Sequence, residues 1–457
     1  MAGPAALLWA GSAWVEGRWR EAVLLEAGAD GHWAAVRPDT PPPPAATRLP
    51  GPVLPGLVNA HSHAFQRAFA GLAERRAGVH DDFWSWRDRM YGVALAITTE
   101  ELRELATRLY RELLAGGYTH VCEFHYLHHA PGGERHADPA AMSLALVQAA
   151  TDAGIGLTLL PVLYERAGFA APGLRADQRR FAADAGFVLE LREHVRQAAT
   201  AARAARAAGA VGSGGTLAEG AGRISAGVAI HSLRAASATS MRALLDRLAG
   251  DAGPIHIHVA EQTGEVDDCL AATGARPIEW LAREGLVDSR WQLVHATHAE
   301  PREIDAVAAS GAGIVVCPTT EANLGDGVPD LPRWLAAGVP LAIGSDSQVC
   351  RSAAEELRWL DYAQRLVHRR RNVAADPARH EGSTAARLFE ACAAGGAGAA
   401  GFTRWGLQRG APADALVLDA TAPGIAGVPA SHRLDAWVFA TDAPAIAQTW
   451  VAGRRVR

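Results

Sequence analysis

Two histidines two residues apart, His61 and His63, stand directly after a short apolar segment and are the first candidates for chemistry. Side chains at this spacing on a β-strand point to the same face, so both imidazoles could reach one metal ion. Apolar residues on both sides of Pro55-Gly56 predict that residues 53–58 form a buried strand that leads into the pair. Paired histidines at the C-terminal end of a strand are typical of a metal site in a β/α barrel. The alternative is a polar strand end with two incidental histidines.

Other strand ends along the chain carry groups that bind metals or transfer protons, and each stands where barrel enzymes place their chemistry. They are His258 and Glu261 at the end of 255–260 and just beyond it, His295 at the end of 292–295, and Asp346 after 341–345. Any one of them alone is more often a hydrogen-bonded structural group or a turn residue. The order HxH, HxxE, H, D in one chain is hard to obtain by chance, and it predicts a shared metal site.

The predicted metal ligands form a nitrogen-rich shell suited to one Zn²⁺ with a water in the open position. They are His61, His63, His258 and Asp346. Zinc lowers the pKa of a bound water to about 7. Asp346 is predicted to take the proton of that water and Glu261 to protonate the substrate, because carboxyl groups in different surroundings hold different pKa values. His295 is predicted to orient the water and stabilise developing charge. Such sites also accept iron, cobalt or nickel, so the metal itself stays open.

The chain contains no lysine, and all 44 of its basic residues are arginine. Codon bias is a sufficient cause, since alanine, glycine and arginine are all abundant. The chemical consequence holds whatever the cause. A Schiff-base lysine, a lysine general base and a carbamylated lysine bridging two metals are all excluded.

Length and periodicity predict the architecture. A chain of 457 residues, 49% of them apolar, suits a barrel with a small appended domain. Apolar strand candidates alternate with amphipathic helices, which predicts βα units and a parallel sheet. The strands are 53–58, 119–124, 156–163, 225–230, 255–260, 292–295, 313–317 and 341–345; the helices include 99–115, 142–153, 239–249, 277–284, 301–309 and 353–369. This number of strands favours a closed (β/α)8 barrel over an open, doubly wound sheet.

Both ends of the chain carry short apolar segments of β character, which predicts one small β domain built from the two ends. The segments are 6–10, 22–25 and 33–36 near the N-terminus, and 414–419, 436–439 and 448–453 near the C-terminus. The predicted domains are therefore 1–55 and 396–457 for the two parts of the small β domain and 56–395 for the catalytic barrel.

Charge and cysteine usage exclude several classes of function. The net charge of -5 is dispersed along the chain and predicts no nucleic-acid partner. No apolar run is long enough to cross a bilayer, and the N-terminus lacks a basic segment typical of a signal peptide. The five cysteines are scattered and form no CxxC pair, which suits a reducing compartment. We therefore expect a cytoplasmic protein with no membrane partner.

The predicted metal ligands, Glu261 and His295 resemble those of the amidohydrolase superfamily of metal-dependent hydrolases. The chain ends resemble the small β-sandwich of that superfamily, and the middle resembles its barrel. One branch bridges two metals with a carbamylated lysine, which this chain lacks. The residues present are similar to those of the deaminase-type branch, which binds one metal.

Longer strings resemble the N-formimino-L-glutamate deiminases of histidine degradation. They are 59–67, 83–91, 123–129, 231–234 and 258–262. The resemblance implies hydrolysis of N-formimino-L-glutamate to N-formyl-L-glutamate and ammonia, and a homodimer. It also implies that His231, Arg234 and Tyr126 hold one substrate carboxylate, that Arg87 holds the other, and that Gln66 lies near the reacting end. Arginines are the side chains that such a dianionic substrate needs.

Two other functions stay open on the residues alone. A single-metal deaminase of a purine, pyrimidine or guanidine compound would need aromatic stacking and amide contacts instead of an arginine clamp. A metal-storage or assembly protein would bind zinc without turnover, and the presence of Glu261, His295 and Asp346 argues against it.

Overall fold

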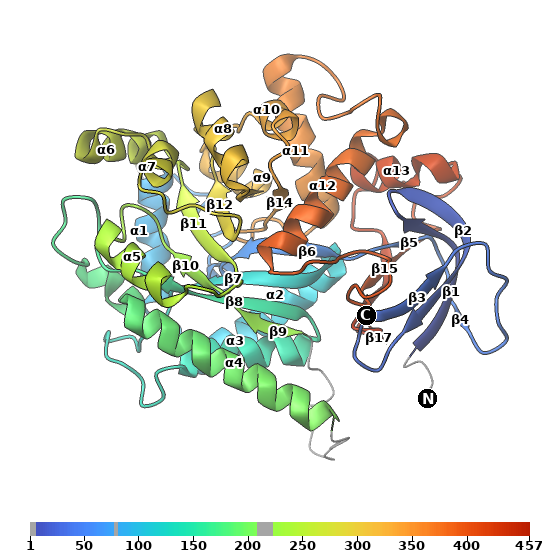
Figure 1. The fold of residues 1–457 in the computed structure, drawn as a ribbon, viewed down its shortest axis with the longest axis horizontal. Helices are drawn as coiled ribbons and strands as arrows, with labels where there is room; N and C mark the ends of the chain where they lie inside the picture. The colour runs from blue at the N-terminus through green and yellow to red at the C-terminus, as the bar shows by residue number, and fades with distance from the viewer. Residues whose placement is uncertain (1–5, 77–80, 208–222) are drawn as a thin grey trace.

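The computed structural model describes residues 6–76, 81–207 and 223–457. Its larger part is a parallel barrel whose strands follow the path β14-β13-β12-β11-β10-β8-β7-β6, with β9 paired to β8 (Figure 1). The strands are β6 (Leu57–Ser62), β7 (Tyr118–His125), β8 (Gly156–Leu163), β9 (Ile224–Ala226), β10 (Val228–Ile230), β11 (Ile255–Val259), β12 (Trp291–His295), β13 (Gly313–Val316) and β14 (Leu341–Ile343). This architecture confirms the predicted α/β barrel.

The barrel closes between its first strand, β6, and its last, β14. An isolated parallel bridge pairs Ser62 with Asp346. The Asp346 backbone N–H donates to the His61 carbonyl at 3.0 Å, and the His63 N–H donates to the Asp346 carbonyl at 3.3 Å. Gly344 allows this approach, because a Cβ there would lie only 2.7 Å from the Cβ of His61. The seam between the two ends of the strand path therefore runs directly through the predicted metal ligands.

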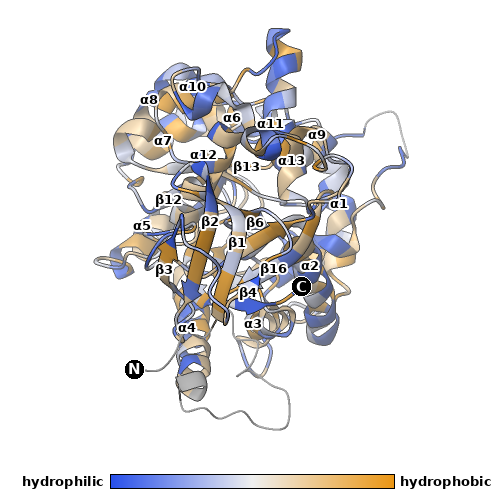
Figure 2. Ribbon diagram, turned by 90° about the vertical axis from the view of Figure 1, so that its right-hand side faces the viewer, coloured by the Kyte–Doolittle hydropathy of each residue, from blue (hydrophilic) through white to orange (hydrophobic). Residues whose placement is uncertain are grey.

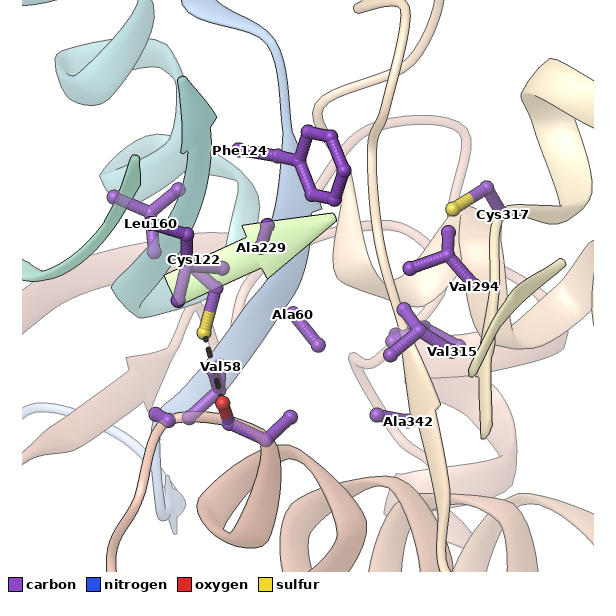
Figure 3. Close-up of a cluster of buried hydrophobic side chains, with 14 of the residues drawn as sticks. Val58, Ala60, Cys122, Phe124, Leu160, Ala229, Val294, Val315, Cys317 and Ala342 are labelled. Atoms are coloured by element: carbon purple, nitrogen blue, oxygen red, sulfur yellow. Dashed lines mark hydrogen bonds between the residues drawn. The ribbon is translucent and has the colours of Figure 1, made fainter. Parts of the chain in front are cut away.

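Small and branched apolar side chains fill the barrel interior (Figure 3). Those labelled in the figure are Val58, Ala60, Cys122, Phe124, Leu160, Ala229, Val294, Val315, Cys317 and Ala342, and all of them are buried. The five cysteines are free and buried, and so act as small apolar side chains. The packed core gives the strand ends a rigid platform.

Helices surround the barrel strands (Figure 1). They are α1 (Phe83–Ala94), α2 (Thr99–Gly116), α3 (Ala141–Ala153), α4 (Ala185–Ala207), α5 (Ala238–Arg247), α6 (Thr263–Thr273), α7 (Pro277–Arg283), α8 (Pro301–Ser310), α9 (Pro318–Leu324), α10 (Leu331–Ala336), α11 (Ala353–His368), α12 (Thr384–Ala399) and α13 (Arg433–Phe439). In helix α2 the local sequence specifies both where the helix begins and where it ends. A reciprocal Thr98–Glu101 capping box begins it, and Gly117 in a left-handed conformation ends it.

The two chain ends form one mixed sheet in the order β17-β16-β15-β5-β1-β2-β3, with β4 paired to β1. The strands are β1 (Ala6–Val15), β2 (Arg18–Ala27), β3 (Trp33–Arg37), β4 (Thr47–Arg48), β5 (Val53–Leu54), β15 (Ala415–Leu418), β16 (Ile446–Val451) and β17 (Arg454–Arg455). Figure 2 shows this sheet toward the viewer, with hydrophobic residues gathered in β2 and hydrophilic ones on outer helices such as α2. The predicted small β-sandwich domain from both chain ends is present as this mixed sheet.

Three element predictions were wrong. Residues 225–230 are not one strand but two, β9 and β10, which are separated at Gly227. Residues 53–58 are not one strand, because Pro55-Gly56 separates β5 in the terminal sheet from β6 in the barrel. Residues 436–439 are not a strand but the last turn of α13, where Trp437 and Leu434 are buried one helical turn apart. A short apolar run fits a buried strand and a buried helix equally well, so periodicity could not separate them.

No helix in the described part of the chain is long and apolar enough to span a membrane. The domain limits at residues 55 and 395 stay predictions. Residues 1–5, within the first predicted domain, lie outside the described residues.

Candidate metal centre and active site

Three imidazoles and one carboxylate converge at the barrel seam. The Nε2 atom of His61 lies 3.1 Å from that of His63 and 2.9 Å from that of His258. The Oδ1 atom of Asp346 lies 3.3 Å from the Nε2 atoms of both His61 and His63. All four side chains are buried. The sequence spacing predicted this convergence, although the four residues come from three separate strands.

The donor set fits a metal ion. Ligand atoms bonded to zinc at about 2.0–2.1 Å lie roughly 3 Å or slightly more from one another, as these do. Burial lowers the pKa of His61 to about 3 and also lowers the pKa of His63 and His258, which keeps the imidazoles neutral. The Nδ1 atom of His63 lies 2.9 Å from the Phe124 carbonyl, which fixes the proton there and frees Nε2 as a ligand. This is a buried metal site of histidines and an aspartate.

A buried hydrogen-bond network holds the two sides of the seam together. Ser62, between His61 and His63, donates to Glu123 at 2.8 Å and accepts from Gln348 at 3.0 Å. The Gln348 side chain also donates to the Asp346 carbonyl at 2.7 Å and accepts from Ser345 at 2.9 Å. Hydrogen bonds within the protein thus position the ligands at the end of β6 and after β14, independently of the metal.

We expect Gln348→Ala to weaken metal affinity by about 10–100-fold, because it removes the link between Ser62 and the segment that carries Asp346. Competition with a chromophoric chelator measures the affinity, and circular dichroism checks that the variant is folded. Gln197→Ala on α4, where the side chain bonds only the exposed Glu193, is the matched control. An unchanged affinity in folded Gln348→Ala would show that the network does not position the ligands.

Three strands leave the barrel through backbone conformations that L-residues rarely adopt. Ala260, His295 and Asp346 have φ values of +51°, +69° and +44°. Such outliers cost about 1–3 kcal/mol each and cluster at functional sites. They turn the chain sharply at the ends of β11, β12 and β14, where the predicted catalytic side chains begin.

Glu261, His295 and Asp346 form one electrostatic unit, and Asp346 is also one of the metal ligands. The Nε2 atom of His295 lies 3.6 Å from Glu261 and 3.9 Å from Asp346. Burial raises the pKa of Glu261 to about 7, so this carboxyl group can both hold and release a proton near neutral pH. Burial alone would raise the pKa of Asp346, but the hydrogen bond from His61 and the nearby imidazoles lower it below its usual range. The two carboxyl groups therefore differ in pKa, so that Glu261 can act as the acid and Asp346 as the base.

Two buried carboxyl groups near this unit were not predicted from the sequence. Glu321 on α9 lies 3.2 Å from Nδ1 of His295, and its negative charge and that of Glu261 raise the pKa of His295 to about 10 against the effect of burial. Asp326 follows α9, and its carboxylate belongs to a cluster with Glu261 and His295 whose donor atoms lie within 4.8 Å of one another. Burial also raises the pKa of Asp326, to about 9. Neither residue follows an apolar run directly, so the strand-end rule could not find them.

The predicted substrate residues line one cavity together with the metal centre. They are Gln66, Arg87, Tyr126, His231 and Arg234, and they share the cavity with His63, His258, Glu261, His295 and Asp346. The Gln66 side chain donates to the Tyr126 hydroxyl at 3.0 Å. The structure thus brings all the predicted site residues to one place, with His61 beneath the cavity wall at the metal centre.

Of the three arginines that line the cavity, Arg87 and Arg234 are weakly paired within the described residues. The closest carboxylate oxygen to Arg234 is that of Glu265 at 3.9 Å, and Arg87 reaches Asp88 at 3.4 Å. The Nε atoms of both arginines are buried without a hydrogen-bond partner in the described part of the chain. By contrast, the side chain of Arg166 donates hydrogen bonds to the carbonyls of the turn that carries Arg234. The cavity therefore offers guanidinium groups with free donors, a strong site for carboxylates.

Other histidines near the strand ends take structural roles. His256, although it shares a spacing of two with His258, bonds the Ala399 carbonyl at 2.8 Å at the C-terminal end of α12. His128 and His129 bond the carbonyls of Val162 and Ala182. Buried hydrogen-bonded histidines of this kind are the common case.

Comparisons with known proteins agree with this geometry. Residues 53–456 match the model of the amidohydrolase family. A formimidoylglutamate deiminase from Pseudomonas aeruginosa is 46% identical over 440 residues, which cover 96% of this chain and 91% of that protein. A crystal structure of an amidohydrolase from Brucella melitensis shares 40% identity with a TM-score of 0.88 and covers 98% of this chain and 94% of its own.

A more distant structure shares the fold. An adenosine deaminase from Xanthomonas campestris, solved with bound zinc, is 23% identical with a TM-score of 0.76 over 100% of this chain and 93% of that chain. The family match spans most of the sequence and includes every residue of the metal centre. This chain belongs to the amidohydrolase family.

Proposed function

We propose that this amidohydrolase hydrolyses N-formimino-L-glutamate to N-formyl-L-glutamate and ammonia, as a deiminase of histidine degradation. The observation that carries the proposal is one cavity that holds a metal centre together with two arginines whose donors are largely free. Hydrolysis of a formimino group needs the metal centre, and binding of two carboxylates needs the arginines. The relative named formimidoylglutamate deiminase, at 46% identity, supports the same substrate.

The cavity residues have separate tasks in this proposal. Arg234, His231 and Tyr126 hold one carboxylate of the substrate, and Arg87 holds the other. His231 is kept in place by a stacked contact with Tyr164, whose ring centroid is 4.3 Å away. Gln66 lies near the reacting end, where its bond to Tyr126 ties the two parts of the cavity together.

His61, His63, His258 and Asp346 would hold the ion, which when bound supplies the Lewis acidity that makes a water nucleophilic at neutral pH. Asp346 takes a proton from that water as its oxygen bonds to the formimino carbon. Glu261 delivers one proton to the terminal nitrogen as the carbon–nitrogen double bond becomes single. The proton held by Asp346 then passes to the same nitrogen and the new hydroxyl group gives its proton to Glu261, so the carbonyl forms, the carbon–nitrogen bond breaks, and ammonia leaves N-formyl-L-glutamate behind. His295, between Glu261 and Asp346, stabilises the charge that passes between them.

We further propose one Zn²⁺ per chain, a homodimer, a cytoplasmic location, and the domain limits 1–55, 56–395 and 396–457. Zinc is supported by the nitrogen-rich donor set, and a single ion by the absence of lysine. Metal analysis of the purified protein tests the ion and its count, and light scattering tests the dimer.

Coupled detection of ammonia with N-formimino-L-glutamate tests the reaction, with adenosine, guanine and cytosine as competing candidates. We expect ammonia release from the first only. Release from a nucleobase or nucleoside and none from N-formimino-L-glutamate would overturn the proposal. A protein that binds one metal and turns over none of these would also overturn it.

We expect Arg234→Ala to raise KM for N-formimino-L-glutamate by roughly 10–100-fold, because a charge-assisted hydrogen bond contributes about 1.5–3 kcal/mol. The kcat should change less, since Arg234 does not touch the reacting carbon in this proposal. Steady-state kinetics measure both values. Arg242→Ala, on exposed α5 and paired with Glu284, is the control, and an unchanged KM in Arg234→Ala would contradict the carboxylate assignment.

A further inference from the structure

Trp84, on the first turn of α1, contacts two of the cavity arginines through one indole ring. The guanidinium carbon of Arg87 lies over this ring at 4.7 Å from its centroid, and that of Arg234 lies over it at 5.2 Å. The two arginines are far apart in sequence and sit on different elements, α1 and the turn after β10. Trp84 does not itself line the cavity, so it is placed behind the arginines.

The two arginines pose an electrostatic problem that this ring addresses. Like charges in one cavity repel, and Arg234 is only 8% exposed. Within the described residues no carboxylate lies closer than 3.4 Å to either guanidinium. The face of an indole carries negative charge density and attracts cations within about 6 Å of its centroid. One neutral ring can thus hold both cations without neutralising them.

The geometry of the contact also explains why the arginine donors are free. A guanidinium that stacks on a ring uses its face, while its N–H groups point outward in its own plane. A carboxylate partner would instead consume those donors. The contact with the ring thus uses no N–H donor of either arginine, in agreement with the buried and unpartnered Nε atoms of Arg87 and Arg234.

The indole is itself held from two sides. Its helix begins with a reciprocal capping box between Asp82 and Ser85, and its six-membered ring lies against α6 at Gly264, where a Cβ would be 3.6 Å from Cζ2 of Trp84. The ring of Phe83 adds an edge contact at 5.0 Å. The half-buried ring thus has neighbours on both α1 and α6.

We propose that Trp84 is a positioning residue that sets the spacing and orientation of Arg87 and Arg234 and so selects ligands with two carboxylates. The proposal rests on the proposed function for its substrate, but its ligand class, a short dicarboxylate, follows from the two guanidinium groups alone. Trp84 touches neither the substrate nor the metal in this arrangement.

The first test is kinetic. We expect Trp84→Leu, in the metal-loaded enzyme, to raise KM for N-formimino-L-glutamate roughly tenfold with little change in kcat, because the cation–π contacts to two guanidiniums are lost. Trp84→Phe keeps an aromatic face and should recover much of the loss. Trp280→Leu, which removes a half-buried indole from α7, is the control for the general cost of losing a tryptophan. A fall in kcat at constant KM, or the same change in Trp280→Leu, would overturn the proposal.

The second test does not require the reaction. Calorimetry with glutarate and with butyrate compares a ligand with two carboxylates against one with a single carboxylate. We expect Trp84→Leu to weaken glutarate binding roughly tenfold and butyrate binding less, since butyrate engages one guanidinium at a time. If the wild type binds glutarate through Trp84 but releases no ammonia from N-formimino-L-glutamate, the proposed function fails and the role of Trp84 stands. If the wild type is active and both Trp84→Leu and Trp84→Phe bind glutarate with wild-type affinity, the proposed role of Trp84 is wrong while the proposed function stands.

Discussion

Glu261→Gln is expected to lower kcat for N-formimino-L-glutamate by about 10²–10⁴-fold and to leave the metal content unchanged. The amide keeps the size of the side chain but cannot carry a proton to the departing nitrogen. Glu261 is not among the converging ligand atoms of His61, His63 and His258, so the ion should remain. Its raised pKa of about 7 is the physical basis of the expectation, because a carboxyl group with an ordinary pKa would hold little acid at neutral pH.

Steady-state kinetics and metal analysis on the same preparation measure the two parts of this prediction. Glu104→Gln, on the exposed face of α2, is the matched control. Activity near that of the wild type would remove Glu261 from the mechanism. Loss of the ion together with activity would place Glu261 among the ligands instead.

Asp346→Asn is expected to abolish turnover and to weaken metal binding more than about a hundredfold, a larger loss than expected for Gln348→Ala, which does not remove a ligand. The substitution removes the one negatively charged ligand, and an amide cannot accept the proton of the attacking water. The asparagine should keep the backbone bonds to His61 and His63 that close the seam.

Titration of the metal-free variant with zinc separates the two effects. We expect excess zinc to restore metal content without restoring turnover, because the proton acceptor is still missing. Asp305→Asn, whose exposed side chain pairs only with Arg333, is the control. Full activity at saturating zinc would mean that Asp346 binds the ion but takes no proton.

Much of the site could be predicted because its chemistry stands at strand ends. His61, His258 and Asp346 each follow or end an apolar run, and a closed barrel brings such ends to one face. The same logic could not find Glu321 or Asp326, which belong to α9 and the segment after it. Tertiary packing decides which loop segments fold back toward the mouth of a barrel. The sequence carries no periodic pattern that reveals them.

The fold predictions failed where local sequence fits two structures. Residues 436–439 are too short for a helical period to appear, and the burial of Trp437 in α13 depends on neighbours distant in sequence. The break at Pro55-Gly56 was visible, yet only the paired strands show that Val53–Leu54 and Leu57–Ser62 belong to different sheets. The role inferred for Trp84 needs the three-dimensional contact with Arg234, which no spacing along the chain reveals.

The seam between β6 and β14 gives metal binding a second consequence. Asn59 and Ser345, which bond each other across it, are 286 residues apart. An ion held by ligands on both sides therefore closes a very long chain loop, as a covalent cross-link would, and the entropy lost in closing such a loop is large. Because the unfolded chain cannot offer these ligands together, the free energy of binding the ion adds to the free energy of unfolding. The ion that the chemistry requires would thus also stabilise the closed barrel against unfolding.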